Sequence, residues 1–282
     1  NNIYNSENKI KKVIVKQLNE VAKKYGQPRK TDIIHEKFVE EITEEHFIKD
    51  YNVKLFLTQQ NYIKKIPLVS LRANPEQKIK EDDCITQEID ARNKDDLLLF
   101  SNKHTVYKIR VHELEDHKAS VLGEYLTNKL ELEDDERIIY IVATGDYKGY
   151  MLFFFENGKS AKIDMSSYIT KTNRRKLLNA YSGISRLIHI MYTESDLELV
   201  AYSSIYKVLI FNTSNINSKT TRDSQGVQVL KQKNDSTMTG IKSIEEAALK
   251  DLDYYRTKNI PAVGYYLKNE DRISDQIEMI LE

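Results

Sequence analysis

Apolar and polar residues alternate in four stretches of the chain, and each stretch has the pattern of a β-hairpin. Each consists of an apolar strand, a polar turn and a return strand that carries lysine. Alternation on both sides of a polar turn is a hairpin signal. The four stretches read VKLFLTQQNYIKKI at 53–66, DLLLFSNKHTVYKIRV at 96–111, GYMLFFFENGKSAKI at 149–163 and LELVAYSSIYKVLI at 197–210.

The hairpins recur at a roughly constant distance. They start 43 to 53 residues apart, at 53, 96, 149 and 197, and shorter strand patterns follow at 84–89, 138–143, 187–192 and 227–230. A lysine lies near the middle of each return strand: Lys64, Lys108, Lys162 and Lys207. About four strands per repeat is typical of a blade array. We therefore predict a mainly β, propeller-like domain of four to five blades; an irregular β-sandwich is the alternative.

Helical patterns flank the β region. Residues 6–25 place apolar side chains at three- and four-residue steps, and Gly26 and Pro28 predict the helix end, with Gly26 left-handed. Ser243 and Glu246 fit a capping box before apolar residues at 247–255. A further strand at 263–267 and a helix at 274–281 complete the prediction. The expected domains are a helical segment 1–34, a β domain 35–243 and a helical tail 244–282.

Composition narrows the class of protein. The chain has 282 residues, of which 40% are hydrophobic and 30% charged, enough for a sizeable core and too polar for a membrane protein. No run of 18 apolar residues is present, so we expect no membrane span. The single cysteine, Cys84, excludes an internal disulfide. The start has neither Met nor a signal peptide, and we expect a piece of a longer cytoplasmic protein.

The charges balance overall but are separated along the chain. Lys plus Arg and Asp plus Glu both total 43. Residues 113–136 hold nine acids and two bases, a net of −7. Residues 159–176 hold six bases and one acid, a net of +5, and residues 207–233 hold five and one, a net of +4. Ordinary solvated surface is one reading. The other is a surface with one cationic side that meets a polyanion.

Signals for catalysis are missing from the sequence. It contains no phosphate-binding glycine loop, no zinc-type Cys/His spacing and no nucleophile-elbow motif. His112 and His117 lie in the acidic stretch and are a weak metal candidate, and Cys84 fits a small core residue. The eighteen tyrosines are expected mainly in core and edge packing. We assign no catalytic residue and no metal ligand.

Repeated cations are the positive signal. A protein that wraps duplex DNA needs regularly spaced cations on a curved rim and no base-reading side chains. A ring of blades with basic outer hairpins meets this requirement. The candidate DNA contacts are Lys64, Lys65, Lys108, Arg110, Lys159, Lys162, Arg174, Arg175, Lys176, Lys207, Lys219, Arg222, Lys231 and Lys233.

Several segments resemble the A subunits of bacterial type IIA DNA topoisomerases, gyrase and topoisomerase IV. The stretch KYGQPRKTDI at 24–33 resembles the end of their breakage-reunion part. Residues 53–67 resemble the first blade of their C-terminal domain, and residues 96–114 and 221–233 resemble later blades. The similarity covers about residues 6 to 240, with its motifs in the family's order.

The resemblance implies a β-pinwheel, a propeller-like ring with strands exchanged between blades, whose basic edge binds and bends double-stranded DNA. It also implies that the intact protein is an ATP-hydrolysing topoisomerase, an isomerase, that works with a B subunit. The family's catalytic tyrosine lies upstream, and no segment here matches its surroundings. ATP and Mg²⁺ would act elsewhere in the intact enzyme, so no cofactor is expected in this chain.

One position departs from the gyrase pattern. Gyrase A subunits carry a Gln-Arg-Arg-Gly-Gly-Lys-Gly-like box shortly after the first blade hairpin. The matching stretch here is RANPEQK at 72–78, without the glycines and paired arginines. This difference favours a topoisomerase IV-like protein over a gyrase that wraps DNA strongly. A propeller-like scaffold that binds proteins, or an enzyme with its site in the channel of the ring, are the alternatives.

Overall fold

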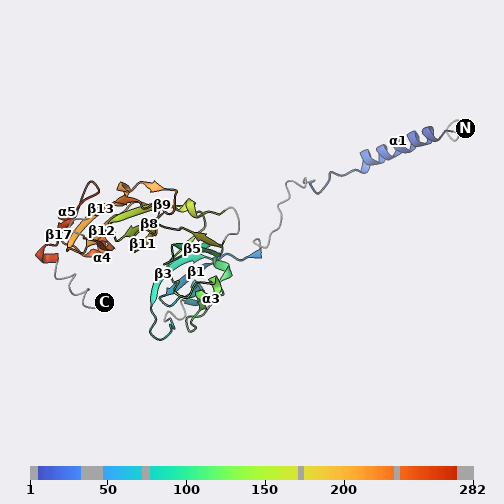
Figure 1. Cartoon of the computed structure of the whole chain (residues 1–282). Helices are drawn as coiled ribbons and strands as arrows, with labels where there is room; N and C mark the ends of the chain where they lie inside the picture. Colours follow the sequence, from blue (N-terminus) through green and yellow to red (C-terminus); the bar gives the residue numbers. More distant parts are fainter. Residues whose placement is uncertain (1–5, 33–46, 72–76, 171–174, 232–235, 272–282) are drawn as a thin grey trace. The chain divides into compact units, whose positions relative to one another are not determined.

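The computed structural model describes residues 6–32, 47–71, 77–170, 175–231 and 236–271. The chain divides into two compact units, Asn1–Phe47 and Ile48–Glu282. The first contains helix α1 (Glu7–Tyr25), which confirms the predicted helix (Figure 1). Gly26 ends α1 with φ of −61°, so the predicted left-handed conformation is wrong. The chain leaves the helix in an extended path toward Pro28 and needs no left-handed residue there.

The described residues of the second unit form four sheets, each built on one of the predicted hairpins. The hairpins pair β1 (Asn52–Thr58) with β2 (Tyr62–Pro67), β4 (Asp96–Ser101) with β5 (Thr105–Arg110), β8 (Tyr150–Phe155) with β9 (Lys159–Asp164), and β12 (Glu198–Ser203) with β13 (Lys207–Asn212). In the first three sheets, the strand that pairs with the first member of the hairpin was also predicted; that of the fourth sheet was not, because the strand predicted at 227–230 pairs with the third sheet instead. These strands are β3 (Ile85–Arg92), β7 (Ile138–Thr144), β11 (Leu187–Thr193) and β16 (Met238–Ser243).

Neighbouring sheets exchange short strands. After each new hairpin the chain returns to pair with the second hairpin strand of the previous sheet, which we call that sheet's outer edge. The returning strands are β6 (Glu124–Tyr125) on β2, β10 (Lys176–Leu178) on β5, and β14 (Ser218–Lys219) and β15 (Val227–Gln228) on β9. In the fourth sheet, β17 (Tyr265–Tyr266) pairs with β13. The mainly β prediction is confirmed.

A left-handed residue occupies the same turn position in all four hairpins: Asn61 (φ 65°), His104 (57°), Gly158 (76°) and Tyr206 (58°). These residues align the hairpins independently of their composition. Four positions further on lie Lys65, Lys108, Lys162 and, in the fourth hairpin, Ile210. The prediction that Lys64 and Lys207 occupy the repeated lysine position is therefore wrong.

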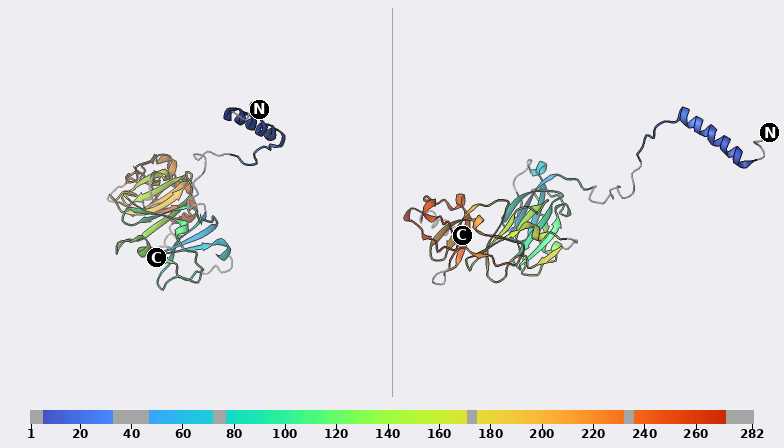
Figure 2. Two further views of the ribbon diagram at one scale, coloured as in Figure 1. Left: turned by 90° about the vertical axis from the view of Figure 1, so that its right-hand side faces the viewer. Right: turned by 90° about the horizontal axis from the view of Figure 1, so that it is seen from above.

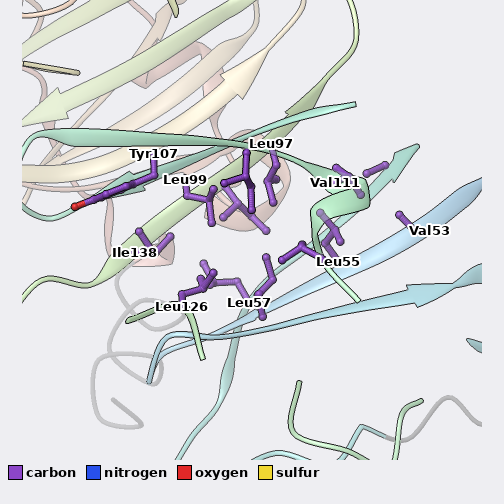
Figure 3. Close-up of a cluster of buried hydrophobic side chains, with 14 of the residues drawn as sticks. Val53, Leu55, Leu57, Leu97, Leu99, Tyr107, Val111, Leu126 and Ile138 are labelled. Carbon is purple, nitrogen blue, oxygen red and sulfur yellow. The ribbon is translucent and has the colours of Figure 1, made fainter. Parts of the chain in front are cut away.

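Hydrophobic cores lie between successive sheets. Leu55 and Leu57 of the first sheet pack with Leu97 and Leu99 of the second, as Figure 3 shows. In β8, Phe153 joins the core with the second sheet, whereas Phe154 joins the core with the fourth. Because alternate residues of a strand face opposite sides, a middle sheet buried on both faces needs the unbroken apolar runs seen in the sequence. Two further views appear in Figure 2.

The terminal sheets cover their remaining faces with local segments. Phe56 and Ile66 of the first sheet pack against Ala119. Val200, Val208 and Ile210 of the fourth pack against residues from the helical segment after β16. The remaining short helices are α2 (Leu68–Leu71) and α3 (Leu126–Leu130), with 3₁₀ turns at Val111–Glu113, Met165–Tyr168 and Thr213–Asn215.

Residues 244–271 differ from the predicted helical tail. They form two single-turn helices, α4 (Ile244–Ala247) and α5 (Leu252–Tyr255), because Ala248 is left-handed with φ of 48°. The predicted capping box at Ser243 is confirmed. Strand β17 lies within the predicted strand, and the predicted helix at 274–281 lies outside the described residues. No helix in the described ranges is long and apolar enough to cross a membrane.

Candidate nucleic-acid interface

The repeated lysine is an internal residue in the first sheet. Lys65 is 3% exposed, and its Nζ lies 3.0 Å from Asp116 Oδ1 and 3.0 Å from Asn93 Oδ1. Lys64 is equally buried and donates to Gln77 and to the carbonyls of Lys78 and Ala119. Burial lowers the pKa of Lys64. The expectation that these two lysines lie on a solvent-facing rim is wrong.

In the second and third sheets, the lysine at the repeated position is paired with a carboxylate. Lys108 Nζ lies 2.9 Å from Asp96 Oδ2, and Arg110 Nε lies 3.0 Å from Oδ1 of the same carboxylate. Lys162 Nζ lies 2.6 Å from Asp196 Oδ1 and 4.4 Å from the centre of the Tyr150 ring. Lys162 is 5% exposed, so it too is wrong as a rim cation.

Three other candidates are half-buried and engaged. Lys159 Nζ donates to Gln225 Oε1 at 2.7 Å, and Arg222 Nη1 donates to the Ser167 carbonyl at 2.9 Å. Lys207 Nζ lies 4.7 Å from the centre of the Tyr266 ring. Arg174 and Lys233 lie outside the described residues. None of the three half-buried cations extends freely toward solvent, and they are weaker candidates for phosphate contact.

Four predicted residues remain exposed: Arg175, Lys176, Lys219 and Lys231. We call them the outer-edge cations because they lie on, or directly beside, the strands added to the second and third sheets. Arg175 pairs with Glu113 at 2.9 Å, but 70% of its side chain is exposed. Lys176 Nζ lies 5.3 Å from the centre of the Tyr107 ring, and the hydrogen bond with Tyr107 raises the pKa of Lys176. These cations are available to a polyanion.

Among the residues that the structure describes, the cationic edge does not continue around all four sheets. At the corresponding place the first sheet presents Glu124 and Tyr125, and the fourth presents Tyr265 and Tyr266. The acidic stretch 113–136 also approaches the second sheet, where Asp135 Oδ2 lies 2.5 Å from Lys103 Nζ. The predicted belt of equal cations on every blade is therefore reduced to the second and third sheets.

The sequence did not reveal the partners of the internal lysines. Tyr51 donates to Asp116 at 2.7 Å and Tyr147 donates to Asp96 at 2.5 Å, so each carboxylate holds a lysine and a tyrosine. Burial, followed by the hydrogen bond to Asp116, raises the pKa of Tyr51 to about 12. Asp116 lies in a loop far from Lys65 in the sequence, whereas Asp96 opens β4 in the same hairpin as Lys108, so no common spacing signals these partners.

Metal binding finds no support within the described ranges. No group of three or more His, Cys, Asp or Glu side chains gathers there. His117, one of the weak metal candidates, instead places Nδ1 2.7 Å from the Glu115 carbonyl. A pocket of about 290 Å³ lies beside β10, lined among others by His104, Leu178 and Ile184.

Sheets built on hairpins and joined by exchanged outer-edge strands define the class, which is the β-pinwheel. No family model matches the chain. Among curated proteins it is 26% identical over 221 residues to the A subunit of DNA topoisomerase 4 from Bacillus subtilis, covering 76% of this chain and 27% of that protein. It is 24% identical over 293 residues to the A subunit of DNA gyrase from Metamycoplasma arthritidis, covering 96% and 32%.

Solved structures point to one part of those subunits. The crystal structure of the C-terminal domain of DNA topoisomerase IV superposes with a TM-score of 0.60 at 25% identity, over 70% of this chain and 62% of that one. The E. coli ParC C-terminal domain shares the fold, with a TM-score of 0.58 at 13% identity over 78% and 95%. The chain is thus a homologue of gyrase and topoisomerase IV A subunits and matches their C-terminal domain. It spans about a third or less of the curated relatives' length.

Proposed function

We propose that this chain is a non-catalytic DNA-binding and DNA-bending domain of a type IIA topoisomerase A subunit. In the intact protein it would present duplex DNA for ATP-dependent strand passage, together with a B subunit, in the cytoplasm. The observation that carries the proposal is the exposure of Arg175, Lys176 and Lys219 on the outer edges of two neighbouring sheets. The homology to topoisomerase A subunits supports it.

Bending follows from the arrangement of these cations. A duplex that contacts the outer edges of two successive sheets must follow the turn from one sheet to the next. Bending a site of 20–30 base pairs costs on the order of 1–6 kcal/mol, and phosphate contacts offset this cost. Because such contacts read the backbone and not the bases, we expect binding without sequence specificity.

The chemistry of strand breakage belongs to other parts of the proposed enzyme. ATP and Mg²⁺ would bind there, and none of the eighteen tyrosines is assigned a nucleophilic role. The stretch at 72–78 lacks the glycines and paired arginines of the gyrase box, so we propose a topoisomerase IV-like activity, relaxation and decatenation, in preference to negative supercoiling.

A salt titration of duplex affinity tests the proposal. Each neutralised phosphate contributes about −0.9 to the slope of log K against log salt, so three contacts contribute about −2.7. We expect the variant Arg175→Ala, Lys176→Ala, Lys219→Ala to bind more weakly, with a slope shallower by about that amount. The matched control, Arg92→Ala, Lys148→Ala, Lys250→Ala, removes three exposed cations away from the outer edges and should leave the slope nearly unchanged.

Equal slopes for the two triple variants would refute the proposed interface. A protein-binding scaffold is the second candidate, because Tyr206 (71% exposed) and Tyr266 (57%) lie exposed on the fourth sheet. That candidate predicts no duplex binding by the unaltered chain, and the same titration would show it.

A further inference from the structure

Two large aliphatic side chains are exposed beside the basic outer edge of the second sheet. Leu178 is 62% exposed and Ile184 is 71% exposed, and both line the pocket beside β10. Aliphatic side chains of this size normally bury most of their surface, because each contributes roughly 1.5–3 kcal/mol when removed from water. Exposure of two at one pocket requires an explanation that packing of this domain does not supply.

Leu178 points to the same side as a phosphate-binding candidate. Leu177 is 4% exposed and faces the core, so Lys176 and Leu178, its neighbours on either side in β10, both face outward. Asn179, with φ of 54°, then turns the chain away. Leu178 is therefore the last outward side chain of the strand.

The pocket also reaches the third sheet's outer edge. Asp223 contributes to its lining and follows Lys219 by four residues in the loop after β14. The pocket that the aliphatic pair lines is thus bordered both by β10, which carries Lys176, and by the loop that follows Lys219. Asp223 and Lys103 both line the pocket, and Lys103 is already paired with Asp135, so the lining offers a phosphate no uncompensated cation and an uncharged base step is the better occupant.

The floor beneath the pair is rigid. Tyr181 is 2% exposed and donates through its hydroxyl to the Ser101 carbonyl at 2.6 Å. The His104 ring packs edge-on against it, with the ring centres 4.9 Å apart. A side chain that separates stacked base pairs needs such support, because it would otherwise be pushed back into the protein and the bases would stay stacked.

We propose that Leu178 and Ile184 form an apolar wedge that enters the minor groove and partly unstacks one base step, kinking DNA held by the outer-edge cations. This inference rests on the proposed function and adds the means of bending to it. Architectural proteins unstack steps with leucine, isoleucine or phenylalanine at a cost of a few kcal/mol per step and bend DNA by roughly 20–90°. Pyrimidine–purine steps deform most easily, so they are the expected sites of insertion.

The test measures binding and unstacking together with the full chain. Duplexes of about 30 base pairs carry 2-aminopurine beside TA steps and a dye pair at their ends for energy transfer. We expect bound duplex to show increased 2-aminopurine fluorescence and a shorter end-to-end distance. The double variant Leu178→Ala, Ile184→Ala should lose most of the fluorescence increase and part of the shortening, with affinity changed less than about threefold.

Two further variants make the comparison specific. Val69→Ala removes another exposed aliphatic side chain, 83% exposed on α2, and should behave as the unaltered chain. Leu178→Phe preserves an apolar wedge and should keep the unstacking signal. All these side chains are exposed, so the melting temperature of each variant should equal that of the unaltered chain. A thermal unfolding curve therefore identifies any variant that fails to fold.

The outcomes separate the wedge from the proposed function. Duplex binding without increased 2-aminopurine fluorescence, or an equal increase with the double variant, overturns the wedge and leaves DNA binding intact. Absence of duplex binding by the unaltered chain overturns the proposed function as well. Loss of the signal in the double variant alone supports the wedge.

Discussion

Asp196 balances the buried charge of Lys162, and removing Asp196 should destabilise the fold more than removing Lys162. Lys162 has 7% of its side chain exposed, whereas Asp196 has 41%, and the two are joined at 2.6 Å. Asp196 also accepts a hydrogen bond from Thr213 at 2.9 Å. Opposite charges about 4 Å apart attract by about 4 kcal/mol at an effective dielectric constant near 20, which roughly offsets the cost of burying the ammonium.

Asp196→Ala leaves that ammonium buried without its counter-charge. Removing one partner of a buried pair costs about 3–5 kcal/mol, and the open side toward Asp196 admits water, so we expect about 2–3 kcal/mol here. For a domain of this size the melting temperature should fall by about 5–10 °C. Lys162→Met removes charge and desolvation cost together and should change stability by less than about 1 kcal/mol. Ile210 already occupies the equivalent position in the fourth hairpin.

Urea unfolding followed by circular dichroism, in a double-mutant cycle, measures the coupling. The variant with both changes should match Lys162→Met alone, so the coupling energy should equal the Asp196→Ala loss, about 2–3 kcal/mol. The control is the pair Lys148–Asp146, also at 2.6 Å but with 77% and 58% of the side chains exposed, where solvent screens the charges and Asp146→Ala should leave the unfolding free energy nearly unchanged. Equal losses from Asp196→Ala and Asp146→Ala would refute the claim that burial makes this lysine structural.

Two other properties can be checked by unfolding experiments. Gly158→Ala should lower the unfolding free energy in urea by at least about 2 kcal/mol, because a Cβ at this position would overlap the Leu230 carbonyl oxygen. Asn61 has a similar φ in the first hairpin but already carries a Cβ, so Asn61→Ala adds no such clash and loses chiefly the hydrogen bonds of the Asn61 side chain. Burial lowers the pKa of His189, so below about pH 6.5 the unfolded chain binds more protons and stability falls as pH decreases from 7 to 5; His189→Gln should flatten the melting-temperature profile over that window, and an unchanged profile would contradict this assignment.

The hairpins could be predicted from sequence because their information is local. Each has alternating or fully apolar strands around a polar turn, and all four appear at the predicted places. Of the exchanged strands, β15 lies within the strand predicted at 227–230, although its pairing with β9 was not predicted, whereas β6 and β14 have only two residues each and no pattern distinguishes them from loops. Their pairing depends on the previous sheet, which lies about fifty or more residues earlier in the chain.

The sequence predicted that the candidate site is made of lysine and arginine, but not which of these residues are exposed. Lysine repeats at one position in three hairpins, yet its carboxylate partner comes from a different place each time: the loop residues Asp116 and Asp196 in the first and third sheets and the strand residue Asp96 in the second. A one-residue difference in register separates Lys64 from Lys65, and adjacent strand residues face opposite sides. Charge can be read from the sequence but burial cannot, so of the fourteen predicted cations only Arg175, Lys176, Lys219 and Lys231 are exposed within the described residues.

Ligase-driven circularisation of a short duplex tests the bending claim most directly. A fragment of about 150 base pairs, one persistence length, closes slowly because it resists bending. Saturating amounts of the chain should accelerate closure several-fold, and the variant Arg175→Ala, Lys176→Ala, Lys219→Ala should not. Closure at the rate of free DNA, under conditions where binding is complete, would contradict the account.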